Sequence, residues 1–153
     1  MANKIQNFDT GEKDNSNIIH LDLDPKINIE NKIYFKNLLK KIAECSLDNL
    51  EENLENLYHV DAEFNGFHPI NEIKGIEEIK NKYLIPLKKA FPDLERRNNL
   101  VIGGAFRDKV FVSFISHLTG TFKNEWLGVK PTNKTIYLRT CEAHQITNNK
   151  IIK

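Results

Sequence analysis

The 153-residue sequence lacks several features that would point to particular classes of protein. Its formal charge is only +1, and its lysines and arginines are spread along the chain. It therefore has no basic surplus of the kind that proteins use to bind nucleic acid through phosphate contacts. No apolar run approaches the roughly 20 residues that a membrane-spanning helix needs. We predict that the protein binds neither nucleic acid nor a membrane.

Cysteine is also scarce. The two cysteines, Cys45 and Cys141, show no spacing that would pair them, so we interpret both as buried thiols. Met1 and the residues after it lead into no apolar signal segment. Because free thiols fit a reducing compartment, we expect the protein in the cytoplasm.

Metal-binding patterns are incomplete. His59 and Asp61 lie two residues apart, with His68 further along, but no cysteine or histidine at standard ligand spacing completes a site. We therefore predict no metal and no cofactor.

The remaining composition is that of a folded domain, with 40% hydrophobic and 28% charged residues. Residues 1–30 have no clear period, so we predict a flexible N-terminal arm there and a single domain over 31–153. Apolar residues at three- and four-residue steps predict three helices in the first half of this domain. They run from about 31 to 45, from 46 to 57 and from 75 to 90. Pro86 lacks an amide proton, so we expect a kink or break in the third helix.

The second half of the chain changes to a two-residue period. A short strand is predicted over 60–64, longer strands over 98–106, 110–122 and 134–147, and the start of another at 151–152. Gly103-Gly104 favours a bulge in the first long strand. Helices followed by an antiparallel meander predict an α+β fold, in which three helices pack on the concave face of a cone-shaped, curved antiparallel sheet. Such a cone leaves room for a pocket.

Five stretches of the chain, taken together and in this order, resemble the SnoaL-like polyketide cyclase family. They are HPINEIKG (68–75), AFPDLERR (90–97), GTF (120–122), WLGVKPTNK (126–134) and RTCEAH (139–144), the last leading to 150–152. The resemblance covers the chain from about Lys32 to its C-terminus. It implies the cone-shaped fold of nuclear transport factor two and a pocket for a small molecule. Relatives continue the last strand, so we expect the domain to be truncated there.

The resemblance also implies an activity. Characterised cyclases of the family close a ring by an intramolecular aldol reaction without metal or organic cofactor, and a carboxylate in the penultimate strand is the general acid and base. The corresponding residue here is Glu142, where the named cyclases have Asp. A misplacement on the order of 1 Å can cost about a hundredfold in rate. Relatives include isomerases, dehydratases, epoxide hydrolases and binders, so the fold alone does not choose the reaction.

The residues around Glu142 support a site independently of the resemblance. Glu142 and His144 lie two apart in a predicted strand and share a face with Leu138 and Thr140. If that face lines a cavity, burial should raise the pKa of Glu142 towards neutral. Glu142 and His144 could then move a proton alpha to a carbonyl. In the structural alternative, Glu142 pairs with Arg139 or a lysine, or faces outwards.

Other residues are candidates for the same pocket. The resemblance places His117 on the pocket side, where it would assist catalysis, although a lone histidine in an apolar strand is more often a core residue. Trp126 suits the rim of a site for an aromatic or polyketide-like ligand, or simply packs its loop on the sheet. His68 borders the pocket or fixes the loop before Pro69, and Tyr83 lies on the inner stripe of its helix.

Three interpretations remain open at this point. The first is a cofactor-independent cyclase- or isomerase-type enzyme acting on a carbonyl compound through Glu142, with His144 or His117 assisting. The second is a ligand-binding or dimerisation module without catalysis, and the third is one half of a larger protein. The apolar second face of the strand over 110–122 fits a homodimer.

Overall fold

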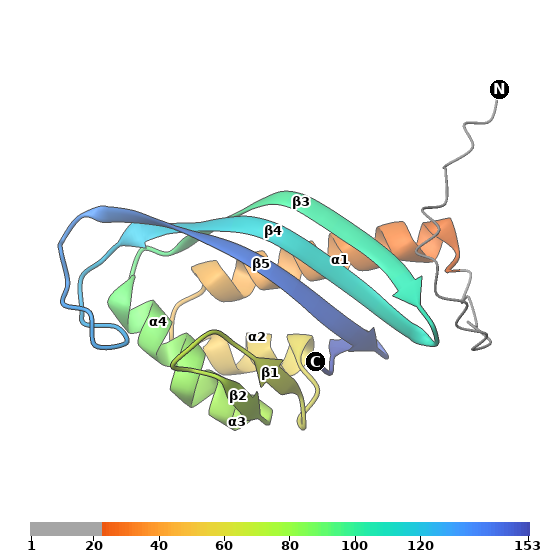
Figure 1. Cartoon of the computed structure of the whole chain (residues 1–153), viewed down its shortest axis with the longest axis horizontal. Coiled ribbons are helices and arrows are strands. Elements are labelled where there is room, and N and C mark those ends of the chain that lie inside the picture. Colours follow the sequence, from red (N-terminus) through yellow and green to blue (C-terminus); the bar gives the residue numbers. More distant parts are fainter. Residues whose placement is uncertain (1–22) are drawn as a thin grey trace, which may run out of the picture.

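The computed structural model describes residues 23–153, so residues 1–22 of the predicted arm lie outside the described part. Two layers make up the described chain, and a long curved sheet arches over the helices (Figure 1). The helices lie on the concave side of the sheet, which confirms the α+β fold predicted from the sequence. Among residues 23–153, no helix combines the length and hydrophobicity that a bilayer crossing requires.

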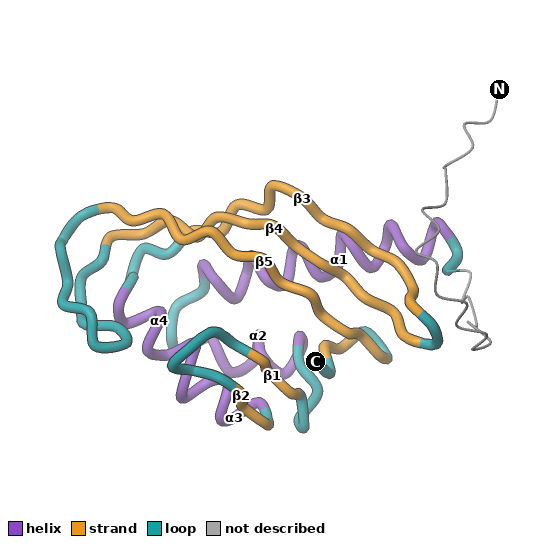
Figure 2. The backbone as a smooth tube through the Cα atoms, viewed as in Figure 1, coloured by secondary structure: helices purple, strands orange, loops and turns teal. Residues whose placement is uncertain are grey.

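The main sheet is antiparallel throughout, with the strand order β3-β4-β5-β6. Its strands are β3 (Glu95–Phe106), β4 (Lys109–Thr121), β5 (Thr135–Thr147) and β6 (Lys150–Ile151). The helical layer contains α1 (Pro25–Glu44), α2 (Leu50–Leu57), and a third segment made of α3 (Ile76–Ile79), the π-helical turn η1 (Lys80–Leu84) and α4 (Ile85–Ala90). A small second sheet pairs β1 (Glu63–Asn65) with β2 (Glu72–Lys74). Figure 2 shows the long strands on one side and the helices on the other.

The first helix starts earlier than the sequence predicted. It begins at Pro25, where the carboxylate of Asp24 accepts hydrogen bonds from two amides of the first turn, at 2.6 and 3.4 Å. A capping Asp followed by Pro at the first helical position is a strong start signal. The apolar periodicity did not predict this earlier start. Ile27 and Ile29 are about half exposed, at 49% and 52%, and do not follow the buried stripe of the helix.

The other helical boundaries also shift. The second helix starts at Leu50 rather than 46, and Asn49, not Ser46, occupies its N-cap. The third segment is interrupted as expected, because the wide turn η1 immediately precedes α4, and Pro86 lies in the first turn of α4. A wider turn relieves the clash between the proline ring and the preceding carbonyls. The strand predicted over 60–64 begins only at Glu63.

The prediction of a bulge at Gly103-Gly104 was wrong. Pairing between β3 and β4 is regular at both glycines, and the register shifts between Asn98 and Leu100 instead. Gly103 lies where α1 approaches the sheet, and the side-chain amide of Asn28 donates to its carbonyl at 3.0 Å. A Cβ at Gly103 would lie 2.1 Å from Asn28 Oδ1. Glycine is therefore needed for the contact between helix and sheet.

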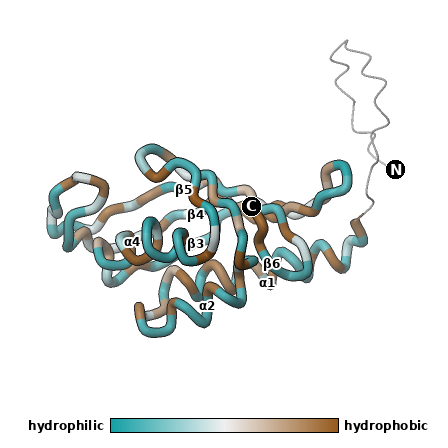
Figure 3. Tube along the Cα trace, turned by 90° about the horizontal axis from the view of Figure 1, so that it is seen from below, coloured by the Kyte–Doolittle hydropathy of each residue, from teal (hydrophilic) through white to brown (hydrophobic). Residues whose placement is uncertain are grey.

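Most of the core lies between the helices and the inner face of the sheet. One buried cluster contains Phe35 and Phe114, and a second contains Phe91 and Phe122. Figure 3, seen from the helix side, shows hydrophilic and hydrophobic residues alternating along the helices, as expected when one face of each helix packs on this core.

Replacing Gly103 by Ala should lower the free energy of unfolding by about 1–3 kcal/mol, because the new methyl group displaces Asn28 and breaks its hydrogen bond. Gly104→Ala is the matched control, since a Cβ there meets nothing within 4 Å. Urea unfolding of the two variants measures the difference. Equal stability of the two variants would contradict a packing role for Gly103.

Candidate functional site

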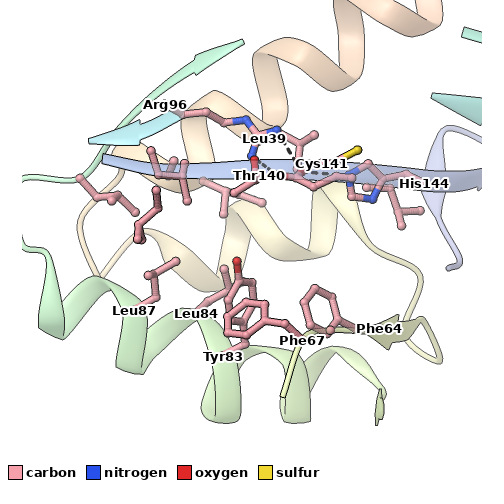
Figure 4. A pocket seen from close by; sticks show the side chains of 18 of the residues that line it. Leu39, Phe64, Phe67, Tyr83, Leu84, Leu87, Arg96, Thr140, Cys141 and His144 are labelled. Atoms are coloured by element: carbon pink, nitrogen blue, oxygen red, sulfur yellow. Dashed lines mark hydrogen bonds and ion pairs between the residues drawn. The ribbon is translucent and has the colours of Figure 1, made fainter. Parts of the chain in front are cut away.

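A cavity of about 620 Å³ lies between the concave face of the sheet and the helices (Figure 4). This volume is within the range usual for small-molecule sites. Residues from both core clusters line it, together with a polar wall on β5 and an aromatic wall opposite. The polar wall consists of Thr140, Glu142 and His144, with Leu138 beside them. Strand alternation thus places these four side chains as predicted.

Glu142 is held by a buried arginine that the sequence did not reveal as its partner. Arg96 on β3 reaches across β4 and donates two hydrogen bonds to the carboxylate of Glu142, each 2.9 Å long. Its guanidinium also donates to Ser116 Oγ at 3.0 Å and to Asn98 Oδ1 at 2.9 Å. The Arg96 side chain is only 6% exposed. Pairing with Arg139 or a lysine, the alternative considered from the sequence, is wrong, because both carboxylate oxygens of Glu142 accept hydrogen bonds from Arg96.

The arginine reverses the expected electrostatics of Glu142. Burial alone would raise the pKa of Glu142, as predicted from the sequence. Hydrogen bonds from His144 and Arg96, together with the positive charge of Arg96, outweigh burial and lower this pKa to about 2. Glu142 is therefore an ionised carboxylate at neutral pH, and the predicted rise in its pKa was wrong.

His144 is the second titratable group at the cavity wall. Its Nε2 atom lies 3.2 Å from Glu142 Oε2, and its ring contacts Phe114 with centroids 5.8 Å apart. Since an ionised carboxylate only accepts hydrogen bonds, the neutral imidazole carries its proton on Nε2. Nδ1 then keeps a free lone pair and makes no hydrogen bond to residues 23–153. The arrangement is a carboxylate-oriented histidine, in which Nδ1 is the basic atom.

The aromatic wall faces β5 from the helical layer. Tyr83 stacks on Phe64 with ring centroids 4.8 Å apart, and Phe67 joins Tyr83 to Trp126 through edge-to-face contacts at 6.5 and 6.0 Å. Trp126 also packs against Phe91 at 5.7 Å. Tyr83 and Trp126 both line the cavity, as predicted. Trp126 is part of a packed aromatic cluster, and its Nε1 is buried without a partner among the described residues.

Comparison of the sequence with family models identifies the family of the chain. A sequence model of the SnoaL-like polyketide cyclases matches residues 36–153. The chain belongs to this family. No curated protein matches the SnoaL-like chain.

Solved structures share the nuclear transport factor 2-like fold of this SnoaL-like domain. A protein of that superfamily from Salmonella enterica serovar Typhimurium has a TM-score of 0.63 and 15% identity, with 83% of this chain and 87% of the other covered. AclR from Streptomyces galilaeus has a TM-score of 0.62 and 20% identity, with 82% and 85% covered. A SnoaL-like protein from Jannaschia sp. CCS1 has a TM-score of 0.61 and 18% identity, with 86% of each chain covered. At these identities the likeness shows the fold alone.

Two histidines of the predicted site lie elsewhere in the SnoaL-like domain. His117 is on the outer face of the sheet, where its Nδ1 lies 2.7 Å from Asn99 Oδ1, so its placement on the pocket side was wrong. The neighbouring residues Ser116 and Leu118 are buried and point inwards instead. His68 is exposed in the loop between β1 and β2, and Phe67 lines the cavity in its place.

Of the remaining sequence candidates, Cys141 lines the cavity, whereas Cys45, His59 and Asp61 do not. Cys141 is exposed and Cys45 is partly exposed, so the prediction of two buried thiols was wrong. His59 Nδ1 lies 3.9 Å from a carboxylate oxygen of Asp61, and both side chains are exposed. Within residues 23–153, no three histidine, cysteine or acidic side chains come together in a way that could hold a metal.

Replacing Glu142 by Gln should lower the free energy of unfolding at pH 7 by about 3 kcal/mol, because it leaves the buried Arg96 without a counter-charge. Urea unfolding measures the change. Glu125→Gln in an exposed loop is the control and should have little effect.

The same contact gives the wild type a defined acid sensitivity. The folded-state pKa of Glu142 is lowered from 4.5 to about 2, so its stabilisation is complete above the unfolded-state value and is lost as pH falls between these values. Unfolding experiments from pH 6 down to about pH 2 should show a smaller loss of stability in Glu142→Gln than in wild type. Parallel pH profiles for the two proteins would contradict the ion pair.

Proposed function

We propose that the SnoaL-like domain is a cofactor-independent enzyme that moves a proton on a small carbonyl compound, as a cyclase or isomerase does. The observation that supports this proposal is the chain of contacts from Arg96 through Glu142 to His144 along the wall of the cavity. An acid or base must lie at a cavity wall to reach a bound substrate, and His144 meets this condition.

The structure changes the roles that the sequence suggested for the two residues. A carboxylate with a pKa of about 2 is a weak base at neutral pH, whereas a neutral imidazole is a competent one. In the proposed reaction, His144 Nδ1 removes a proton alpha to the carbonyl. Glu142 stabilises the resulting imidazolium, and Arg96 keeps Glu142 ionised. The imidazolium then returns the proton to a carbon or to a developing alkoxide.

The cavity also indicates the kind of ligand. Aromatic side chains face the polar wall on β5, and such a lining suits a flat, largely apolar molecule that carries a few oxygen atoms. The proposed ligand is therefore an aromatic or polyketide-like carbonyl compound, in keeping with the family.

The alternative is a binding module of the same fold without catalysis. One observation favours this non-catalytic alternative. Arg96 occupies both carboxylate oxygens of Glu142, so Glu142 cannot act as a direct base. The outer face of the sheet exposes Leu100, Ile102 and Tyr137, and a homodimer through this face stays a prediction.

Proton exchange tests the enzyme directly. We expect wild-type protein in D₂O to accelerate deuterium incorporation alpha to the carbonyl of an aryl ketone, and a panel beginning with 1-tetralone can be followed by NMR. His144→Gln should lower the protein-catalysed rate by about 10²- to 10⁴-fold, the usual contribution of a general base. His117→Gln is the matched control on the outer face and should leave the rate unchanged.

The outcome separates the two candidates. Binding of the ketones without any exchange would support the non-catalytic alternative. Equal exchange by wild type and His144→Gln would remove His144 from the mechanism.

A further inference from the structure

Two tyrosines that line the cavity have hydroxyls without a hydrogen-bond partner in the described part of the chain. Tyr58 directly follows α2 and is 6% exposed, and Tyr83 is half-buried in η1. Both line the cavity, and neither hydroxyl has a hydrogen-bond partner among residues 23–153. Figure 4 shows the Tyr83 oxygen directed from the helical layer towards β5. Neither hydroxyl is among the fully buried atoms that lack a partner in the described residues, so both are open to the cavity and available to donate to a polar atom of a ligand.

The surrounding structure holds the ring of Tyr83 and the backbone of Tyr58. Tyr83 stacks on Phe64 and meets the edge of Phe67. The Tyr58 amide donates to Leu54 at 2.8 Å, and Tyr58 forms a bridge with Ile151 of β6. Donors held in place before a reaction lose little energy in reorganising when charge develops on the substrate. The Tyr83 ring and the Tyr58 backbone are therefore held in place before a ligand binds, as an anion-stabilising site requires.

The electrostatic environment keeps both phenols protonated. Burial raises the pKa of Tyr83 to about 12, and the negative charge of Glu142 contributes to the rise. Burial and then Glu142 raise the pKa of Tyr58 well above its usual range. Both groups are therefore hydrogen-bond donors at neutral pH, and both respond to the carboxylate of Glu142.

We propose that the hydroxyls of Tyr58 and Tyr83 form a two-donor site for the oxygen of an enolate. This inference rests on the proposed function and adds the groups that would stabilise the product of its first step. When His144 Nδ1 takes the alpha proton, the C–H electron pair forms a carbon–carbon double bond. The carbonyl π electrons move to oxygen, which receives the two phenol hydrogen bonds. Return of the proton from His144 reverses the electron movement, so no oxidant or reductant is consumed.

The substrate class follows from this arrangement. The Tyr83 hydroxyl lies in the wall opposite β5, which carries His144 (Figure 4), so a carbonyl oxygen bound there and the acidic C–H bond must point to opposite sides of one molecule. A ketone in a flat ring system presents these two groups in that way. An ester or amide would gain less, since its alpha proton is much less acidic.

A phenol that resembles an enolate tests the site without turnover. We expect wild-type protein to bind 4-nitrophenol as the phenolate, which is visible by absorbance at a pH below the pKa of the free probe, and to bind its neutral ether 4-nitroanisole more weakly. Tyr58→Phe and Tyr83→Phe should each raise the Kd for 4-nitrophenol about tenfold, the usual effect of losing a hydrogen bond to a charged acceptor. Tyr34→Phe, at a residue of α1 that is 41% exposed and does not line the cavity, is the matched control and should not change the Kd.

Both variants keep the aromatic ring, so packing in the core should persist, and circular dichroism verifies this. Three results would each reject the enolate site: no binding of 4-nitrophenol by wild type, equal binding of the ether, or unchanged affinity in the cavity tyrosine variants. If exchange that depends on His144 persists alongside any of these results, the proposed function stands and only the tyrosine site fails. If wild type shows no proton exchange on the ketones that it binds, the proposed function itself fails.

Discussion

The ion pair between Arg96 and Glu142 is the constraint on which the rest of the site depends. It joins β3 to β5 across the intervening strand, and it does so at the wall of the cavity. A buried guanidinium is expensive to desolvate, and here Ser116 and Asn98 satisfy the hydrogen bonds that Glu142 does not. Because hydrophobic residues often stabilise a core as well as a buried ion pair does, stability alone gives little reason for this arrangement. A role in the chemistry of the cavity accounts for it better.

In the proposed function, this ion pair gives the residues of the site different roles. Arg96 fixes Glu142 as a permanent anion, so Glu142 can orient a histidine but is a poor proton carrier itself. In the proposed reaction, His144 offers its Nδ1 atom on the same strand, and the phenols of Tyr58 and Tyr83 would supply hydrogen-bond donors at the cavity. The polar wall and the aromatic wall both line the cavity of about 620 Å³ that the curved sheet forms with the helices.

Sequence periodicity predicted the fold and one wall of the site, for reasons that are local. Alternation along a strand depends only on neighbouring residues, so the sequence could predict that Glu142 and His144 share a face. The partner of Glu142 was not, because Arg96 meets it through a register across two strand pairs that one sequence does not specify. The sign of the Glu142 pKa shift depends on that contact and was missed with it. The resemblance placed His117 on the pocket side, and the sequence pattern could not correct this, because both faces of β4 are largely apolar.

The pKa of Glu142 in the folded protein tests this account most directly. It can be measured by following the side-chain carboxyl carbon of Glu142 by NMR during an acid titration, in wild type and in Arg96→Met. The account predicts a value near 2 in wild type, and a clear rise when the guanidinium is removed. A wild-type value at or above 4.5, unaffected by the loss of Arg96, would contradict it.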